Sequence, residues 1–153
     1  MSLAFTLARP KDLDPLADLV RAYYEYDGHP FDDSKAREAL AGLLANPELG
    51  RVWVFRDDVR PVGYLALTFG YSIEFGGRDA FIDEFFLEEE YRGRGFGKQA
   101  LETAAHEAAA LGVHALHLEA VRGNDRAVAL YRRSGFVDHE RYLLSRVLKT
   151  RSK

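Results

Sequence analysis

The sequence has no cysteine, so the chain can form no disulfide, no thiolate metal site and no covalent cysteine intermediate. No apolar run approaches the roughly 18–20 residues that a membrane-spanning helix needs. The first ten residues, MSLAFTLARP, lack the basic start and continuous apolar stretch of a signal peptide. A net charge of −3, from 21 basic and 24 acidic residues, gives no strong positive field for nucleic acid. We therefore expect a cytoplasmic protein that binds neither nucleic acid nor membrane.

The sequence also contains no internal repeat, no low-complexity stretch and no linker rich in glycine or proline. Its 153 residues, 47% of them hydrophobic, suffice for one domain with a buried core. We expect a single domain over residues 1–153.

Hydrophobic spacing predicts an alternation of strands and helices. Helices are predicted over 13–26, capped by Asp12, over 36–44 after a cap within 32–34, from a glycine-rich turn to Gly112, and over 125–134. The predicted strands are residues 4–8, 51–55, 62–71, 79–87, 113–121 and 142–148. Because 79–87 is apolar on both faces, we expect it near the centre of the sheet. The order predicts a mixed α/β fold, with antiparallel hairpins first and a strand–helix–strand unit later.

The segment RGRGFGK at residues 92–98 carries the strongest functional signal. It lies between a buried strand and a helix, where glycines allow close backbone approach and the helix start directs N–H groups at an anion. Two common phosphate loops do not fit. The P-loop spacing is one residue short and is followed by Gln99 rather than serine or threonine, and Lys98 occupies the last glycine position of GxGxxG. We interpret the segment as a cradle for a diphosphate.

The same segment matches R-x-x-G-x-G, and downstream the chain reads Asn124-x-x-Ala127-x-x-x-Tyr131-x-x-x-Gly135-Phe136. Together these motifs resemble the GCN5-related N-acetyltransferase (GNAT) family, and the order of elements over residues 4–149 agrees with that fold. The resemblance implies a mixed, mostly antiparallel sheet flanked by helices, with two splayed central strands. It also implies acetyl-CoA as cosubstrate and no metal. Members of the family are often dimers, and the last predicted strand is a candidate to pair across a homodimer.

The resemblance implies specific contacts with acetyl-CoA. Backbone groups of Phe85, Phe86 and Leu87 would hold the pantetheine arm, which Asn124 would also contact, and Tyr131 would lie near the sulfur as its proton donor. A backbone N–H near Phe85 would stabilise the carbonyl oxygen. The cofactor-binding set is Phe85, Phe86, Leu87, Arg92, Gly93, Arg94, Gly95, Phe96, Gly97, Lys98, Asn124 and Ala127. From the residues alone, Asn124 also fits a helix cap and Tyr131 a core position.

Two carboxylates in the apolar strand, Asp83 and Glu84, are the candidates to accept a proton from an attacking amine. Adjacent strand positions point to opposite faces, so only one should face the acceptor unless a bulge intervenes. The longer reach of Glu84 favours it slightly. A structural ion pair with an arginine is the alternative for either residue.

The stretch 23–33 is rich in aromatic and acidic residues, which suit a cationic amine, and Tyr24, Glu25 and Asp27 are the candidate acceptor contacts. An ordinary helix end with a solvated acidic turn is the alternative. His106-Glu107 begins an HExxH motif, but residue 110 is alanine, so no zinc site is expected. We expect an N-acetyltransferase that acts on a polyamine, a diamine or a lysine-like small amine by direct attack. A protein N-terminus or lysine as acceptor, and a non-catalytic acyl-CoA-binding module, are the alternatives.

Overall fold

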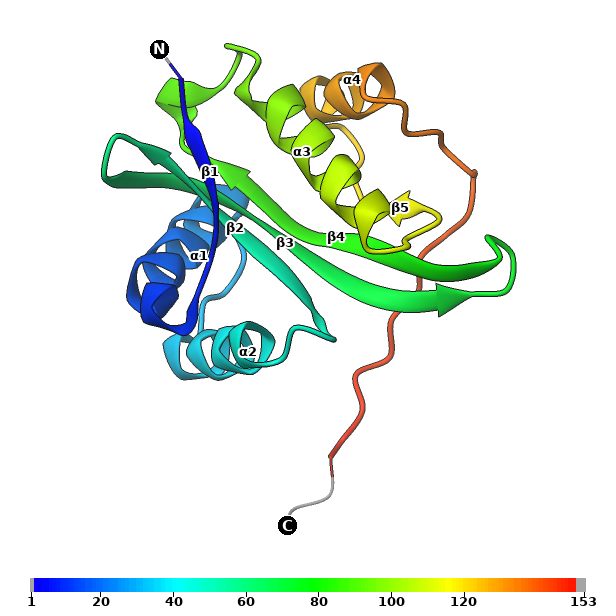
Figure 1. Cartoon of the computed structure of the whole chain (residues 1–153), viewed down its shortest axis with the longest axis horizontal. Coiled ribbons are helices and arrows are strands. Elements are labelled where there is room, and N and C mark those ends of the chain that lie inside the picture. Colours follow the sequence, from blue (N-terminus) through cyan, green and yellow to red (C-terminus); the bar gives the residue numbers. More distant parts are fainter. Residues whose placement is uncertain (1, 151–153) are drawn as a thin grey trace.

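The computed structural model describes residues 2–150 as four helices, five strands and two short 3₁₀ turns (Figure 1). The strands are β1 (Ala4–Leu7), β2 (Gly50–Asp57), β3 (Arg60–Ser72), β4 (Gly77–Leu87) and β5 (Leu116–His117). The helices are α1 (Leu13–Asp27), α2 (Asp33–Ala45), α3 (Phe96–Ala110) and α4 (Asp125–Arg133), and the 3₁₀ turns are η1 (Pro10–Asp12) and η2 (Glu89–Tyr91).

The five strands form one sheet in the order β1-β2-β3-β4-β5. The first four pair antiparallel with their neighbours, and β5 pairs parallel with β4. The mixed, mostly antiparallel sheet predicted from the sequence is therefore confirmed. The strand expected near the centre over 79–87 is β4, an interior strand that pairs with the middle strand β3 on one side and with the edge strand β5 on the other.

Helices cover both faces of the twisted sheet (Figure 1). On one face α1 packs through Leu16, Leu19 and Val20 onto side chains of β2, β3 and β4. On the other face α3 packs through its apolar stripe, which includes Leu101 and Ala104, and α4 adds Leu130 and Tyr131 at the border of the same core. The sheet thus separates two apolar layers, and residues of β4 contribute to both.

The helix starts differ from the sequence predictions in one case. Asp32 caps α2 by accepting a hydrogen bond from the Lys35 N–H, and Asn124 caps α4 by accepting one from the Ala127 N–H. Asp12 precedes α1 but its side chain does not cap that helix. Its carboxylate instead accepts a hydrogen bond from the Arg9 N–H and lies 3.2 Å from a guanidinium nitrogen of Arg56.

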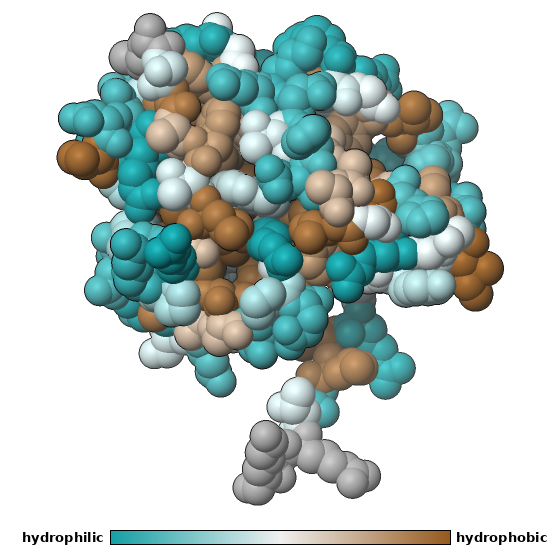
Figure 2. All heavy atoms as spheres, viewed as in Figure 1, coloured by the Kyte–Doolittle hydropathy of each residue, from teal (hydrophilic) through white to brown (hydrophobic). Residues whose placement is uncertain are grey.

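Two predicted strands are corrected by the structure. Of the predicted strand 113–121 only Leu116–His117 forms a strand, β5. Backbone hydrogen bonds from the His114 N–H to Arg78 and from the Ala80 N–H to Ala115 precede it, and the chain leaves β4 after His117. Residues 142–148 form no strand: they project away from the sheet (Figure 1), and hydrophobic side chains are visible on the projecting segment in Figure 2. The segment is rich in apolar residues, as a buried strand is, but within residues 2–150 it has no strand to pair with.

Strand β4 contains a bulge beside the two candidate carboxylates. Ala66 pairs with Glu84, whereas the next residue of β3, Leu67, pairs with Ile82. Asp83 is therefore the extra residue, and two positions of β4 oppose one of β3. This irregularity interrupts the strict alternation of faces, so Asp83 and Glu84 need not point to opposite sides.

Candidate functional site

The end of β4 has one open edge, on the side of β5. Strands β4 and β5 pair only at Ala80–Leu116 and Phe81–His117. At this fork His117 Nε2 lies 3.0 Å from Asp79 Oδ2, a contact between the two strands with both side chains largely buried. Beyond the fork β4 continues for six residues to Leu87, and no strand among the described residues pairs with that side of it.

The backbone groups at the open edge can be assigned from the pairing of β3 with β4. The Glu88 N–H donates to the Val62 carbonyl, and in an antiparallel ladder the hydrogen-bonded positions alternate. Phe86 therefore directs its backbone groups toward β3, while Phe85 and Leu87 direct theirs toward the open edge. Of the three residues predicted to hold a pantetheine arm, Phe85 and Leu87 therefore have backbone groups that face the open edge.

The loop between β4 and α3 has the backbone that its glycines allow. Gly93 has φ +73° and Gly95 has φ +87°, left-handed values that other residues adopt only with strain. Gly95 is the N-cap of α3, and a Cβ added there would meet no atom within 4 Å. The first N–H groups of this 15-residue helix have no acceptor within the helix, and the space beside Gly95 is open, as an anion site requires.

Two arginines take positions at this loop that the sequence did not predict. The Arg126 guanidinium, from the first turn of α4, lies 2.7 Å from where a Gly93 Cβ would be. It brings positive charge to the glycine loop from a separate helix. The Arg92 side chain turns away instead. Its Nε donates to the Leu87 carbonyl at 2.7 Å, and its guanidinium lies 4.1 Å from the ring centroid of Tyr26.

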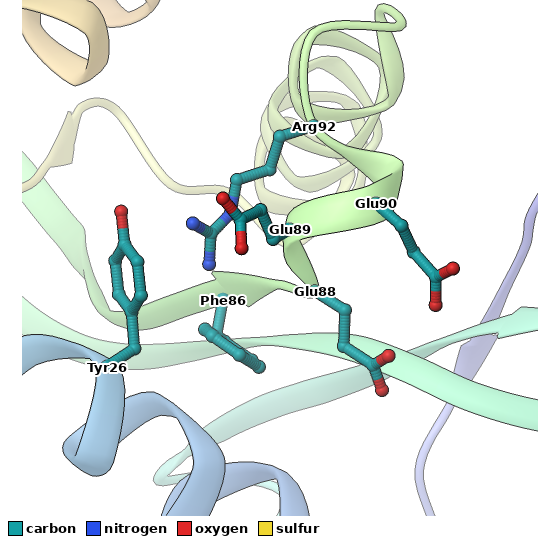
Figure 3. Close-up of a pocket in the computed structure, with 6 residues that line it drawn as sticks. All are labelled: Tyr26, Phe86, Glu88, Glu89, Glu90 and Arg92. Carbon is teal, nitrogen blue, oxygen red and sulfur yellow. The ribbon is translucent and has the colours of Figure 1, made fainter.

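Arg92 also borders a pocket of about 600 Å³ at the end of β4. Figure 3 shows its guanidinium near Tyr26 and Phe86, while Glu88 and Glu90 point to the opposite side. Both of these glutamates pair with Arg60. The Phe86 ring also contacts Tyr23, with 5.6 Å between ring centroids. This pocket is therefore next to a group of acidic and aromatic side chains around Glu84, here called the acidic cluster: Asp27, Asp83, Glu84, Tyr23 and Tyr24. The residues of the cluster do not line the pocket.

Two phenols hold the Glu84 carboxylate. Tyr24, from α1, donates to Oε2 at 2.5 Å, and Tyr64, from β3, donates to Oε1 at 2.7 Å. Burial raises the pKa of Glu84, and the two phenol hydrogen bonds act in the opposite direction. The same contacts and burial raise the pKa values of Tyr24 and Tyr64, which keeps both phenols protonated. Glu84 is thus fixed in orientation, with part of its acceptor capacity already used.

Asp83 has a different environment. It is exposed, and no side-chain hydrogen bond or ion pair to it is found within residues 2–150. Partial desolvation by surrounding protein raises its pKa. Its charge acts on Glu84, Tyr23 and Tyr24, raising the pKa of each. At the bulge both carboxylates are therefore near Tyr23 and Tyr24. Glu84 is held by two hydrogen bonds, whereas Asp83 is exposed.

Tyr131 approaches this cluster from α4, on the other side of the sheet edge. Burial raises its pKa, so the phenol stays protonated near neutral pH. Tyr23 has a pKa raised to about 12, first by burial and then by the charges of Asp27, Glu84, Tyr131 and Asp83. The three predicted catalytic residues, Tyr131, Glu84 and Asp83, thus all affect the pKa of Tyr23. Tyr131 packs in the apolar layer on the α3 side of the sheet, and Tyr23 in the layer on the α1 side.

The predicted acceptor contacts divide into two groups. Tyr24 and Asp27 lie in the cluster, and His29 Nε2 is 2.7 Å from Asp27 Oδ2. The His29 ring also contacts Tyr24, at 6.1 Å between centroids. Glu25 is on the exposed side of α1, and no contact joins it to the cluster within the described chain.

Sequence comparison identifies the family. The model of the acetyltransferase (GNAT) family matches residues 13–136, which is most of the chain. The chain belongs to this family. The integron cassette protein HFX_CASS3, from the mobile metagenome of Cole Harbour Salt Marsh, has TM-score 0.85 and 34% identity over 95% of this chain and 91% of that one.

Two further relatives bear on the ligands. A predicted acetyltransferase from Clostridium acetobutylicum, solved with acetyl-CoA, has TM-score 0.82 over 95% of this chain and 96% of that one, and its 20% identity shows the fold alone. Thialysine N-epsilon-acetyltransferase of Bos taurus is 34% identical over 77 residues, 50% of this chain and 45% of that protein. The chain spans between 38% and 58% of the length of the curated relatives it matches.

Two features are absent from residues 2–150. No helix there is long and apolar enough to cross a membrane, and no three histidine, aspartate or glutamate side chains converge as a metal site would need.

Two residues of the site, Tyr64 and Arg126, were not predicted from the sequence. Tyr64 lies in an apolar strand and belongs to no motif. Arg126 lies inside the Asn124–Ala127 motif, and its positive charge was the signal that could have indicated a contact with an anionic ligand.

Proposed function

We propose that the chain is an acetyl-CoA-dependent N-acetyltransferase that acts on a small primary amine by direct attack in a ternary complex. The observation that supports this most is that Asp83 and Glu84 lie at the bulge of β4, the strand with the open edge, and that Tyr131 of α4 affects the pKa of Tyr23 together with both carboxylates. A proton donor and two proton acceptors are there next to a backbone edge that can hold an extended ligand. The absence of cysteine accords with a cytoplasmic location.

The residues at the open edge and the glycine loop fit acetyl-CoA. The N–H groups at the start of α3, with Arg126, would hold the diphosphate, and Phe85 and Leu87 would pair with the pantetheine amides. Asn124 uses its side-chain oxygen as a cap, which leaves its amide nitrogen to donate to the same arm. With these contacts the thioester would lie near Tyr131 and the carboxylates.

In the proposed reaction the amine nitrogen forms a bond to the acetyl carbon and the carbon–sulfur bond breaks. Asp83 accepts the proton that the amine loses, and Tyr131 donates a proton to the departing sulfur. The products are the N-acetylated amine and CoA thiol, and proton exchange with solvent restores Asp83 and Tyr131. We assign proton acceptance to Asp83 because two phenols already engage Glu84, although side-chain reach alone favoured Glu84.

Glu84 then has the role of binding the acceptor as a cation. Its charge and that of Asp83 act on both Tyr23 and Tyr24, and the charge of Asp27 acts on Tyr23. Carboxylates and ring faces together favour an ammonium group. A diamine or lysine-like acceptor brings a second positive charge, which this acidic cluster can bind while the first amine reacts. The name of the Bos taurus relative, a thialysine acetyltransferase, agrees with this class of acceptor.

The test is release of CoA thiol from acetyl-CoA across a panel of amines: thialysine, lysine, spermidine, a short diamine and a short peptide with a free N-terminus. We expect the highest kcat/KM among the small diamines and lysine-like amines. A preference for the peptide would show a protein acetyltransferase. Binding of acetyl-CoA without thiol release for any amine would show a non-catalytic acyl-CoA-binding module.

A further inference from the structure

One positive charge at the end of β4 has no role in the reaction proposed above. The Arg92 guanidinium carbon lies 4.1 Å from the ring centroid of Tyr26 and 5.5 Å from that of Phe86. Its Nε donates to the Leu87 carbonyl, and no hydrogen bond or ion pair to its two terminal nitrogens is found within residues 2–150. A guanidinium that stacks on rings does so through its face. The N–H groups at its edge therefore remain free to donate to a planar anion such as a carboxylate.

The pocket of about 600 Å³ that Arg92 borders contains a second charge without an ion-pair partner. Glu88 and Glu90 line the pocket, but both pair with Arg60, at 3.1 and 2.6 Å, and Figure 3 shows them pointing to the side opposite Arg92. Glu89 also lines the pocket and is exposed, and no ion pair to it is found in the described part of the chain. The pocket thus presents one guanidinium and one carboxylate that are both available to a ligand.

This pocket is one strand step away from the carboxylates of the proposed reaction. Glu84 and Phe86, which lines the pocket, are two positions apart on β4. Their partners on β3, Ala66 and Tyr64, both pack in the apolar layer on the α1 side, so the two side chains share that face. Two positions along a strand span about 7 Å, and an extended side chain of lysine length covers a comparable distance. A ligand with its α-carbon in the pocket can therefore reach Asp83 and Glu84 with a terminal amine.

The two charges of the pocket match the two charges of a free amino acid. An α-carboxylate fits the edge of a guanidinium through two parallel hydrogen bonds, and an α-ammonium fits the Glu89 carboxylate. A diamine or polyamine has no anionic group, so the Arg92 charge would only repel it. A lysine within a protein has neither group, because both are used in peptide bonds. The pocket therefore distinguishes between acceptors that the acidic cluster alone would bind equally.

We propose that Arg92 and Glu89 form a binding site for the α-carboxylate and the α-ammonium of a free amino acid whose side chain ends in the amine to be acetylated. This inference rests on the proposed acetyltransferase function and narrows its acceptor to amino acids of the lysine type. Tyr26 and Phe86 hold the guanidinium in place. The side-chain amine would then lie at the acidic cluster, where the transfer takes place.

The first test compares lysine with lysinamide, in which an uncharged amide replaces the α-carboxylate, at a pH that keeps both α-amines protonated. Release of CoA thiol gives kcat/KM for each, and we expect lysine to be favoured about tenfold, as one charge-assisted pair would give. Arg92→Gln should remove this preference. Arg133→Gln, the matched loss of one arginine in the last turn of α4, should retain it. Any effect of Arg92→Gln on acetyl-CoA binding applies to both amines and cancels in their ratio.

A second pair of acceptors tests Glu89. The compound ε-aminocaproate is lysine without its α-amino group, so it keeps the carboxylate and lacks the α-ammonium. We expect the unmodified chain to favour lysine over ε-aminocaproate. Glu89→Gln should reduce that preference and leave the preference for lysine over lysinamide in place.

Calorimetric titration of lysine and lysinamide into the chain with CoA present measures the same site without turnover. Affinity or kcat/KM for lysine that is equal to or below that for lysinamide would overturn the proposal, as would a preference for lysine that survives Arg92→Gln. Lysine binding that depends on Arg92, with no acetylation of any amine, would contradict the acetyltransferase function and leave the amino-acid site intact. Failure of the inference and failure of the proposed function thus give different results.

Discussion

The Tyr24 hydroxyl donates a 2.5 Å hydrogen bond to the Glu84 carboxylate, which joins the last turns of α1 to the bulged part of β4. Tyr64 holds the other carboxylate oxygen from β3. A buried carboxylate tolerates its position only when its oxygens have donors. The two phenols therefore account for the presence of Glu84 in an apolar strand, and they distinguish it from Asp83.

Tyr64→Phe tests this link, because it removes one donor and keeps the ring in a fully buried position. We expect the free energy of unfolding to fall by about 1–3 kcal/mol, the usual cost of leaving a buried charged acceptor short of a donor. The pKa of Glu84 should rise further, since the lost bond had lowered it. Chemical denaturation at neutral pH measures the first effect. Unchanged stability would show that water or another group satisfies Glu84.

The pH dependence of kcat/KM tests the assignment of the base. A proton acceptor must be ionised, so activity should rise as pH increases through a carboxyl pKa that lies above its ordinary value of about 4. This ascending limb should vanish in Asp83→Asn. In Glu84→Gln it should persist, with KM for the amine raised. The reverse outcome would assign the base to Glu84, and persistence in both variants would mean that the amine loses its proton elsewhere.

Stability should change with pH in the opposite sense to activity at Asp83. The pKa of Asp83 is raised in the folded chain, so its ionised form opposes folding. The free energy of unfolding should therefore be higher at low pH and should fall as the pH rises through that pKa. Asp83→Asn removes this dependence. We expect the variant to melt higher than the parent chain at neutral pH, with the difference shrinking in acid. A difference that is constant with pH would contradict the raised pKa.

Binding of acetyl-CoA should depend on Arg126 and on Gly95. Arg126→Gln removes the charge that α4 brings to the loop, and we expect affinity to fall about tenfold, or ~1.4 kcal/mol. Gly95→Val fills the open space at the start of α3 and strains a φ of +87°, so a loss of at least that size is expected. Arg133→Gln, in the last turn of α4 and away from the loop, is the matched control. Calorimetry showing parental affinity in folded Arg126→Gln and Gly95→Val proteins would contradict this cofactor site.

The sequence predicted correctly those elements whose conformation depends on residues within them. The amphipathic spacing of 13–26 predicted α1 to within one residue of its end at Asp27. The glycine loop was read correctly as a tight turn before a helix, because its conformation depends on residues that lie within it. The strand order of the hairpins followed from short connections between consecutive strands.

Contacts between distant segments could not be predicted in this way. The bulge at Asp83 arises from a register shift against Ala66 and Leu67, which no pattern in β4 alone records. Tyr64 reaches Glu84 from 20 residues away in the sequence. The segment predicted as a strand at 142–148 has the apolar residues of a strand. A strand also needs a partner, and the sequence pattern does not say where that partner lies.

The most direct test of the account is the balance of products with a diamine as acceptor. Mass spectrometry of the amine and a thiol assay, run on the same reaction, should give one acetylated amine for each CoA released. Tyr131→Phe keeps the packing and removes the proton donor, so turnover should fall by about 10²–10⁴-fold with acetyl-CoA affinity unchanged. Release of CoA without acetylated amine, or turnover within about twofold in Tyr131→Phe when chemistry is rate-limiting, would contradict the proposed reaction.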